Sequence, residues 1–202
     1  MARFGMLIDL TLCMGCGACM VACKTEHQIP TGKHNGHEYY RIGPLKYEMG
    51  KYPAVKRGYL PMFCMQCEKA PCIDICPIKG ALYRRDDGVI IIDKDKCDGC
   101  KLCIQACPYK ALYFNEEKLV VDKCDFCAER LEQGLEPACV TACLGKAIIF
   151  GDFDDSSSKV SRRVVKKNVK GGSPLLPSYF NKAFKPSVYY IEPKKSDSEM
   201  QG

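Results

Sequence analysis

The sequence predicts an α+β fold in which short helices and two-stranded ribbons surround loops rich in cysteine. The chain has 16 cysteines among 202 residues, and they fall into four groups of four with related spacings. Two stretches between these groups, at 80–96 and 110–123, read as strand, turn, strand. Apolar runs are short, so we expect the cysteine loops to occupy much of the interior.

The spacing inside the groups is that of cysteines that hold iron-sulfur clusters. The first and third groups read C-x2-C-x2-C-x3-C, the run found in bacterial ferredoxins. The second group stretches the middle gap to four residues, and the fourth group places a long loop there. In chain order the groups are Cys13, Cys16, Cys19, Cys23; Cys64, Cys67, Cys72, Cys76; Cys97, Cys100, Cys103, Cys107; and Cys124, Cys127, Cys139, Cys143.

The groups are expected to work in pairs, because in two-cluster ferredoxins the cysteine after the x3 step binds the other cluster. Pro77 and Pro108 follow the last cysteines of groups two and three, as in the bacterial run, whereas Lys24 and Leu144 follow those of groups one and four. Groups two and three therefore form one module, and groups one and four pair by elimination. The result is a duplicated bacterial-ferredoxin-like fold with one two-cluster module nested in another.

This pairing predicts four [4Fe-4S] clusters with cysteine at all sixteen ligand positions. The expected ligand sets are set A, Cys13, Cys16, Cys19 and Cys143; set B, Cys124, Cys127, Cys139 and Cys23; set C, Cys64, Cys67, Cys72 and Cys107; and set D, Cys97, Cys100, Cys103 and Cys76. Structural zinc is the main rival, because paired C-x2-C units also bind zinc, but it leaves the x2-x2-x3 runs unexplained. A disulfide scaffold is disfavoured because cysteines three residues apart rarely meet bridge geometry.

The elements of the first half follow in order along the chain. Residues 3–10 alternate as a strand, and residues 16–27 continue as a short helix after the first cysteines. HEYYRI at 37–42 and GYLPMF before the second group read as further strands.

The end of the chain adds three elements. AIIFGDF at 147–153 reads as a strand, and the helix that follows has Asp155 or Ser156 as its N-cap. Val160, Val164 and Val165 form its apolar stripe, which favours packing on the core over the alternative of a membrane-surface or docking helix. KPSVYYIEP reads as a strand on the body or on a partner, and SDSEM near the end as disordered. The predicted organisation is an outer module of residues 1–27 and 110–155, an insertion at 28–58, an inner module at 59–109, and a C-terminal helix and extended tail at 156–202.

Net charge and hydropathy narrow the possible partners. The formal charge is +6, but four oxidised clusters with their thiolates contribute about −8 and bring the loaded protein to roughly −2. We therefore expect no nucleic-acid partner. No stretch approaches the roughly 18 apolar residues of a membrane-spanning helix, and we expect no signal peptide of the chain's own before the first cysteines.

Three histidines and five lysines lie near the cysteines, and neither set is expected to act at the clusters. His27, His34 and His37 lie in or beside a Gly-rich loop, which is expected to be solvated or to form an interface and not to bind a metal or haem. The lysines beside cysteines are expected to point into solvent, and they are Lys24, Lys96, Lys101, Lys110 and Lys123. The sequence has no nucleophile with a base, no paired carboxylates and no phosphate loop, so we predict no active site on this chain.

The four groups, with GYLPMFCMQCEKAPCIDICPIKGAL, CDGCKLCIQACPYKAL and KCDFCAERLEQGLEPACVTAC around the last three, resemble the iron-sulfur subunits of the dimethyl-sulfoxide-reductase superfamily. The resemblance is greatest to the subunits of polysulfide and thiosulfate reductases. It covers roughly residues 3–155, with Leu144 standing where many relatives have proline. The short loop between groups three and four lacks the insertion expected of arsenate-type relatives.

The resemblance implies a non-catalytic electron-transfer subunit of an anaerobic respiratory complex. Its partners would be a molybdenum or tungsten pterin catalytic subunit and a multi-span membrane quinone or quinol subunit, with an inorganic sulfur compound as the substrate of the complex. Electrons would pass from set A at the catalytic subunit through sets B and D to set C near the membrane. The subunit would be peripheral to the membrane, exported folded with its partner or held on the cytoplasmic face. The alternative is a cytoplasmic polyferredoxin subunit of a formate dehydrogenase, hydrogenase or tungsten aldehyde-oxidising complex.

Overall fold

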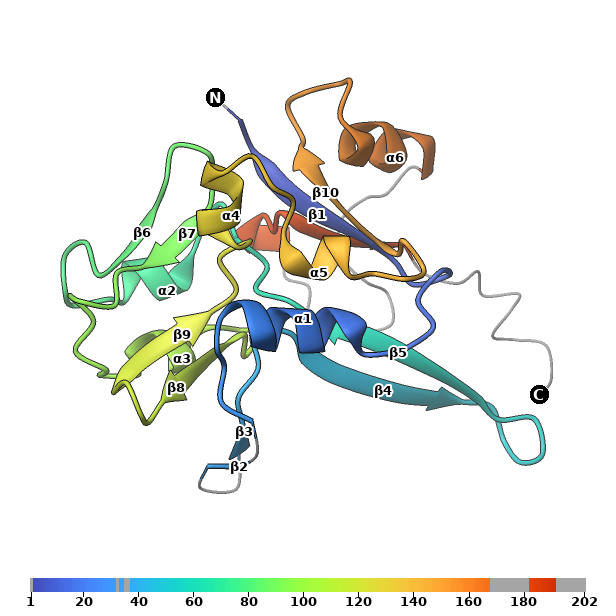
Figure 1. Ribbon diagram of the computed structural model, residues 1–202, viewed down its shortest axis with the longest axis horizontal. Helices are drawn as coiled ribbons and strands as arrows, with labels where there is room; N and C mark the ends of the chain where they lie inside the picture. Colours follow the sequence, from blue (N-terminus) through green and yellow to red (C-terminus); the bar gives the residue numbers. More distant parts are fainter. Residues whose placement is uncertain (1, 32, 35–36, 168–181, 192–202) are drawn as a thin grey trace.

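The computed structural model describes residues 2–31, 33–34, 37–167 and 182–191. It is a mixed fold of short helices and small sheets, as the sequence predicts. Figure 1 shows a three-stranded sheet and a long hairpin on one side, and a cluster of shorter ribbons and helices on the other.

The three-stranded sheet joins segments from both ends of the chain. β1 (Phe4–Asp9) lies in the centre, antiparallel to β10 (Ile148–Asp152) and parallel to β11 (Val188–Ile191). Met6, Leu7 and Ile8 on β1 have no exposed surface, because both faces of this strand are covered. The strands predicted at 3–10 and 147–153 are confirmed. The predicted strand in KPSVYYIEP is also confirmed, and it lies on the body of the protein.

The remaining strands form two-stranded antiparallel ribbons. They are β2 (Lys33–His34) with β3 (His37–Glu38), β4 (Gly43–Met49) with β5 (Lys56–Met62), β6 (Leu82–Arg84) with β7 (Ile90–Ile92), and β8 (Leu112–Asn115) with β9 (Val120–Lys123). The last two ribbons confirm the predicted strand–turn–strand stretches. Gly88 supplies the positive φ of the β6–β7 turn.

The helices are short, and α1 to α5 begin in or just after the cysteine loops. They are α1 (Ala18–Glu26), α2 (Pro71–Asp74), α3 (Leu102–Ala106), α4 (Ala128–Glu132), α5 (Ala138–Thr141) and α6 (Lys159–Lys167), with a 3-10 turn, η1, at Lys182–Phe184. α1, from the first cysteine group, contacts α5 from the fourth, and α2, from the second, contacts α3 from the third.

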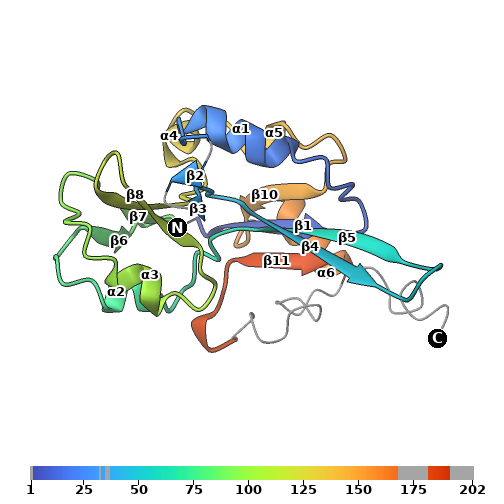
Figure 2. The same cartoon turned by 90° about the horizontal axis from the view of Figure 1, so that it is seen from below.

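The strand expected at 37–42 is wrong in extent. Only His37–Glu38 is a strand there, and the long strand that pairs with β5 is Gly43–Met49. Tyr39 stacks on the ring of Tyr113, and Arg41 and Ile42 are buried. These side chains fix the segment through tertiary contacts instead of a strand ladder. β4 and β5 then form a long hairpin that extends from the body (Figures 1 and 2), with Tyr52 at its exposed tip.

The N-cap of α6 is Ser158, not Asp155 or Ser156. The Ser158 hydroxyl accepts a hydrogen bond from the Ser161 N–H at 3.2 Å, whereas the Asp155 carboxylate accepts one from the Ser157 N–H in the preceding turn. Val160 is fully buried and packs beside Gly151 on β10, so this helix packs on the core as predicted. The predicted disorder of SDSEM and the side chain of Val165 lie outside the described residues.

One ion pair ties α6 to the central strand. The Arg163 guanidinium donates to the Asp9 carboxylate at 2.9 Å, and the Asp9 side chain has no exposed surface. Burial opposes ionisation of Asp9, but hydrogen bonds from Thr11 and Arg163 outweigh it and hold its pKa below the usual 3.8.

We expect Asp9→Asn to lower the free energy of unfolding by about 1–3 kcal/mol, because it removes a buried charged acceptor. Since the folded pKa of Asp9 is depressed, the pair stabilises the fold above pH 3.8 and this contribution is lost as the pH falls through the folded value. Anaerobic urea unfolding followed by circular dichroism measures the effect. The matched control is Asp154→Asn, whose partner Arg3 is half exposed. This control should cost less than about 1 kcal/mol, and equal effects of the two variants would contradict the assignment.

Candidate metal centres

Each cysteine loop curls through residues with positive φ, which turns the sulfurs inward. Gly15 has φ +68°, and a side chain there would clash with the Tyr59 ring, so glycine is required. The corresponding residues in the other three loops are Gln66; Gly99 and Lys101; and Phe126 and Cys127. The short gaps of the sequence motif thus produce tight loops around a common centre.

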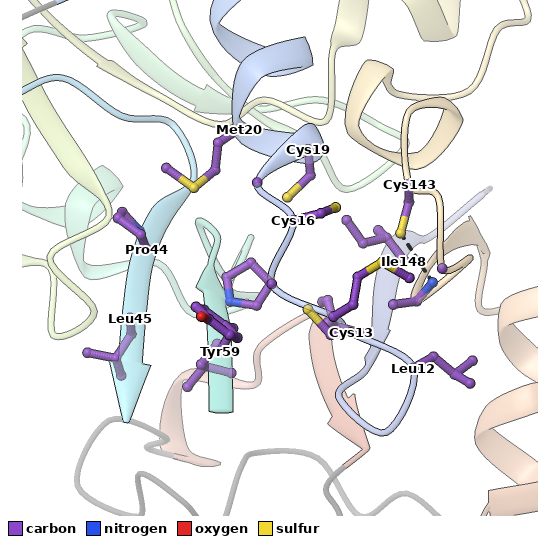
Figure 3. Close-up of a pocket in the computed structure, with 18 of the residues that line it drawn as sticks. Leu12, Cys13, Cys16, Cys19, Met20, Pro44, Leu45, Tyr59, Cys143 and Ile148 are labelled. Atoms are coloured by element: carbon purple, nitrogen blue, oxygen red, sulfur yellow. Dashed lines mark hydrogen bonds between the residues drawn. The ribbon is translucent and has the colours of Figure 1, made fainter. Parts of the chain in front are cut away.

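Set A lines a cavity of about 310 Å³ between the first loop and the base of the long hairpin. Figure 3 shows Cys13, Cys16 and Cys19 from the loop and Cys143 from the far side of the same pocket. Cys143 Sγ accepts a hydrogen bond from the Ala147 N–H at 3.2 Å. Residues 13 to 19 and residue 143 meet here because β1 and β10 are neighbouring strands.

The thiols of sets C and D line two smaller cavities. Cys107 joins Cys64, Cys67 and Cys72 around the first, and Cys76 joins Cys97, Cys100 and Cys103 around the second. The last cysteine of each inner group therefore lies with the other group, as the x3 step predicts. In the described part of the chain, no three His, Cys, Asp or Glu side chains are arranged to hold a single metal ion.

The thiols of set B are the most deeply buried. Burial raises the pKa of Cys124 and Cys139 well above the usual value, and charge on Cys23 raises both further. Charge on Cys127 likewise raises the pKa of Cys23, after burial. α1, which carries Cys23, contacts α5, which carries Cys139, so the first and fourth cysteine groups meet at set B.

The donors in all four sets fit a multi-iron cluster. Burial, followed by the other cysteines of the set, raises the pKa of Cys19 to about 11 and that of Cys67 to about 12. Such crowded thiols stay protonated at neutral pH unless a cation compensates for their charge, and iron in a cluster supplies that compensation. Binding of clusters by these sixteen cysteines remains a prediction.

The sets follow one another through the molecule in the order A, B, C, D. After burial, charge on Cys19 of set A is among the causes that raise the pKa of Cys139 in set B. Charge on Cys64 of set C does the same to Cys124 in set B, and charge on Cys103 of set D to Cys72 in set C. Gln66, between Cys64 and Cys67 of set C, also donates a hydrogen bond to the Cys124 carbonyl of set B at 2.7 Å. These contacts favour the order A, B, C, D over the order A, B, D, C that the resemblance implies.

Arg41 organises the loop of set B, and the sequence analysis missed it. Its guanidinium donates to Asp122 at 2.8 and 3.1 Å and to Asp125 at 2.8 Å, and its side chain is 2% exposed. Asp125 in turn accepts a hydrogen bond from the Cys127 N–H at 2.9 Å. The insertion thus braces a cysteine loop more than 80 residues away. A lone arginine in HEYYRI carries no motif that predicts this.

His27 also lies closer to the cysteines than expected. Its Nε2 is 3.2 Å from Cys127 Sγ, and burial, then the charge of Arg41, lowers its pKa. His27 is half-buried at the end of α1 and lies against set B, so of the two expected environments, solvent or an interface, it is not simply solvated. The side chains of His34 and His37 lie outside the described residues.

The lysines near cysteines divide into two classes. Lys96, Lys101 and Lys110 are exposed as expected, and Lys24 is half buried with its ammonium over the Tyr40 ring. Lys123 is only 1% exposed, so the expectation of a solvent-facing side chain is wrong there. All four residues of β9 are buried, so both faces of this strand are covered and Lys123 is enclosed with the rest.

Comparison with protein families identifies two iron-sulfur regions. Residues 55–153 match the model of a 4Fe-4S dicluster domain, and residues 4–25 match that of a 4Fe-4S binding domain. These matches favour iron-sulfur over zinc and over a disulfide scaffold. Within the described residues, no helix is long and apolar enough to cross a membrane.

Three curated relatives illustrate the range of similar proteins. The protein is 37% identical to a chain of the polysulfide reductase of Wolinella succinogenes over 98% of each of the two sequences. It is 41% identical to a subunit of the tetrathionate reductase of Salmonella typhimurium over 79% of this sequence and 62% of that one. It is 34% identical to the arsenate respiratory reductase iron-sulfur subunit of a Shewanella species over 80% of this sequence and 87% of that one. Similarity therefore extends to an arsenate-type relative despite the short loop between groups three and four.

We expect Arg41→Met to destabilise the protein by about 3–5 kcal/mol, because it leaves Asp122 and Asp125 buried without their cation. Loss of iron should accompany this, since the braced loop carries Cys124 and Cys127. Iron content per chain and anaerobic urea unfolding measure both effects. Arg57→Met is the control, because Arg57 pairs with Glu48 on the exposed hairpin and should change neither quantity. Full iron content and unchanged stability in Arg41→Met would contradict the bracing role.

Proposed function

This protein belongs to the iron-sulfur subunits of the dimethyl-sulfoxide-reductase family, and we propose from this membership that it carries electrons between two partner subunits of a respiratory complex. [4Fe-4S] clusters, when bound, supply one-electron redox chemistry. The protein's own residues hold them and set their surroundings. Catalysis takes place on another subunit, as it does in the oxidoreductase complexes of the relatives.

The single observation that carries the proposal is the convergence of thiols from different sequence groups on common cavities. Cys143 meets the first loop, Cys107 the second and Cys76 the third. This exchange of the fourth thiol is what a chain of neighbouring clusters requires. We propose sets A to D as the ligands of four [4Fe-4S] clusters, and the nested outer module, inner module and insertion as the domain organisation.

The order of the sets suggests the path of the electrons. Sets B and C are central, and their cysteines are largely buried, whereas Cys16 of set A and Cys100 of set D are exposed. Electron transfer to a partner needs a cluster near the surface, so we propose sets A and D as the two entry and exit points.

Exposed apolar side chains lie near sets A and D, the two ends of the proposed path. Near set A, Leu12, Met14 and Leu144 are 43%, 61% and 72% exposed. Near set D, Ile75 and Leu102 are also exposed. Such patches beside a redox centre are typical of subunit interfaces. We propose that a molybdenum or tungsten pterin catalytic subunit docks at set A and a membrane quinone or quinol subunit at set D, which makes this protein a peripheral subunit.

The substrate of the complex is proposed from the relatives. Polysulfide and tetrathionate reductase subunits are among them, which favours an inorganic sulfur compound. The polyferredoxin of a formate dehydrogenase, hydrogenase or tungsten aldehyde-oxidising complex is the alternative, and the identity of the partner chains separates the two.

The ligand sets predict which cluster each x3 cysteine serves. We expect Cys76→Ser to change the same electron paramagnetic resonance signal as Cys100→Ser, because both residues line the cavity of set D. By the same reasoning Cys107→Ser should change the same signal as Cys67→Ser. Spectra in which Cys76→Ser instead matches Cys67→Ser would overturn the crossed assignment.

Purification with native partners tests the function as a whole. The protein is isolated without oxygen from source membranes, co-purifying chains are identified by mass spectrometry, and molybdenum and tungsten are assayed. A pterin subunit together with a multi-span membrane subunit is the expected result. A soluble complex with hydrogenase or aldehyde-oxidising chains would replace the proposal with the polyferredoxin.

A further inference from the structure

Lys123 places an ammonium group deep inside the protein. The residue ends β9 and is 1% exposed. Its Nζ donates hydrogen bonds to the carbonyl oxygens of Ile90 and, at 3.0 Å, of Cys124. Both of these acceptors are backbone carbonyls, so neither hydrogen bond neutralises the charge.

Gln66 fixes both acceptors in place. Its side chain is fully buried, its Nε2 donates to the Cys124 carbonyl at 2.7 Å, and its Oε1 accepts from the Ile90 N–H at 2.7 Å. Lys123, Ile90, Gln66 and Cys124 therefore form a closed ring of hydrogen bonds. These four hydrogen bonds support one another and hold the ammonium at one position.

The ring lies between two of the ligand sets. Cys124 belongs to set B, Gln66 lies between Cys64 and Cys67 of set C, and Ile90 lines the cavity of set C. The charge of Lys123 also lowers the pKa of Cys72 in set C, against the larger effect of burial. The ammonium thus acts on both central sets.

Asp125, whose pKa the charge of Lys123 helps to lower, is already paired with another cation. Lys123 contributes to the low pKa of Asp125, but Arg41 contributes more and pairs with Asp125 at 2.8 Å. Burial of an ammonium without an anionic partner is costly. A cluster with four thiolates is a large local negative charge and compensates for it.

We propose that Lys123 is the shared counter-charge of sets B and C and raises the reduction potentials of the two clusters they hold. The reason is that reduction adds negative charge, which a fixed neighbouring cation stabilises. This inference rests on the proposed function. It adds a residue that sets the reduction potentials of the two central clusters of the path, where most of the cysteines are buried and water screens charge poorly.

The experiment is a redox titration of the loaded protein with its partners, followed by electron paramagnetic resonance. In Lys123→Met, we expect the reduced-to-oxidised ratio of the clusters of sets B and C to fall at least tenfold at a fixed potential, which is about 59 mV for one electron. The clusters of sets A and D should shift less, because the hydrogen bonds of the ammonium go to Cys124 of set B and to Ile90 at the cavity of set C. Unchanged potentials of both central clusters would overturn the inference.

The matched control is Lys96→Met. Lys96 directly precedes Cys97 as Lys123 directly precedes Cys124, but its side chain is 57% exposed and pairs with Asp93. Solvent screens its charge, so its removal should leave the potentials nearly unchanged. Lys123→Arg keeps the charge and should retain potentials near the original. Equal shifts in Lys96→Met and Lys123→Met would overturn the inference.

If Lys123→Met does not retain iron, a second variant tests the inference. Gln66→Glu keeps the lysine and places a carboxylate in the same ring, so the central potentials should fall in the same direction. If the Gln66→Glu clusters load fully and titrate as in the original protein, the inference fails. If clusters load and shift but no partner subunits co-purify, the proposed function fails while the role of Lys123 stands.

Discussion

The structure depends on one constraint, which is that thiols from distant parts of the chain must meet around common centres. Cys143 reaches the first cysteine loop only because β1 and β10 pair, and that pairing joins two segments separated by more than 130 residues. Cys76 and Cys107 cross between groups at the contact of α2 with α3. The short helices and ribbons are the connections that this convergence requires, so the fold cannot be separated from its metal centres.

The interior is held together by charge as much as by hydrophobic packing. Arg41, Asp122 and Asp125 form a buried ion-pair network that braces the loop of set B. Lys123 and Gln66 form a second polar ring beside it. Buried charges of this kind are costly in an ordinary core. They are consistent with an interior in which clusters provide negative charge that the polypeptide must balance.

The errors of the sequence analysis share a physical origin. The segment at 37–42 has the β-propensity of a strand, but the stacking of Tyr39 on Tyr113 and the ion pairs of Arg41 decide its conformation instead. Lys123 and Lys96 occupy the same position relative to a cysteine, yet only Lys123 is buried. The contact of the set C loop with the set B loop was also not expected. Each of these features depends on which parts of the chain pack together, and no local sequence pattern encodes that packing.

The sequence by itself determined the class of fold, the likeness to iron-sulfur subunits and the grouping of the cysteines. It did so because cluster ligation imposes rigid spacing within each loop, and spacing is a property of consecutive residues. The tertiary structure decided the neighbours of each cysteine set, the brace from Arg41, the contact of His27 with Cys127, and the burial of Lys123. These are long-range contacts between segments with no common motif, so they exist only once the chain has packed.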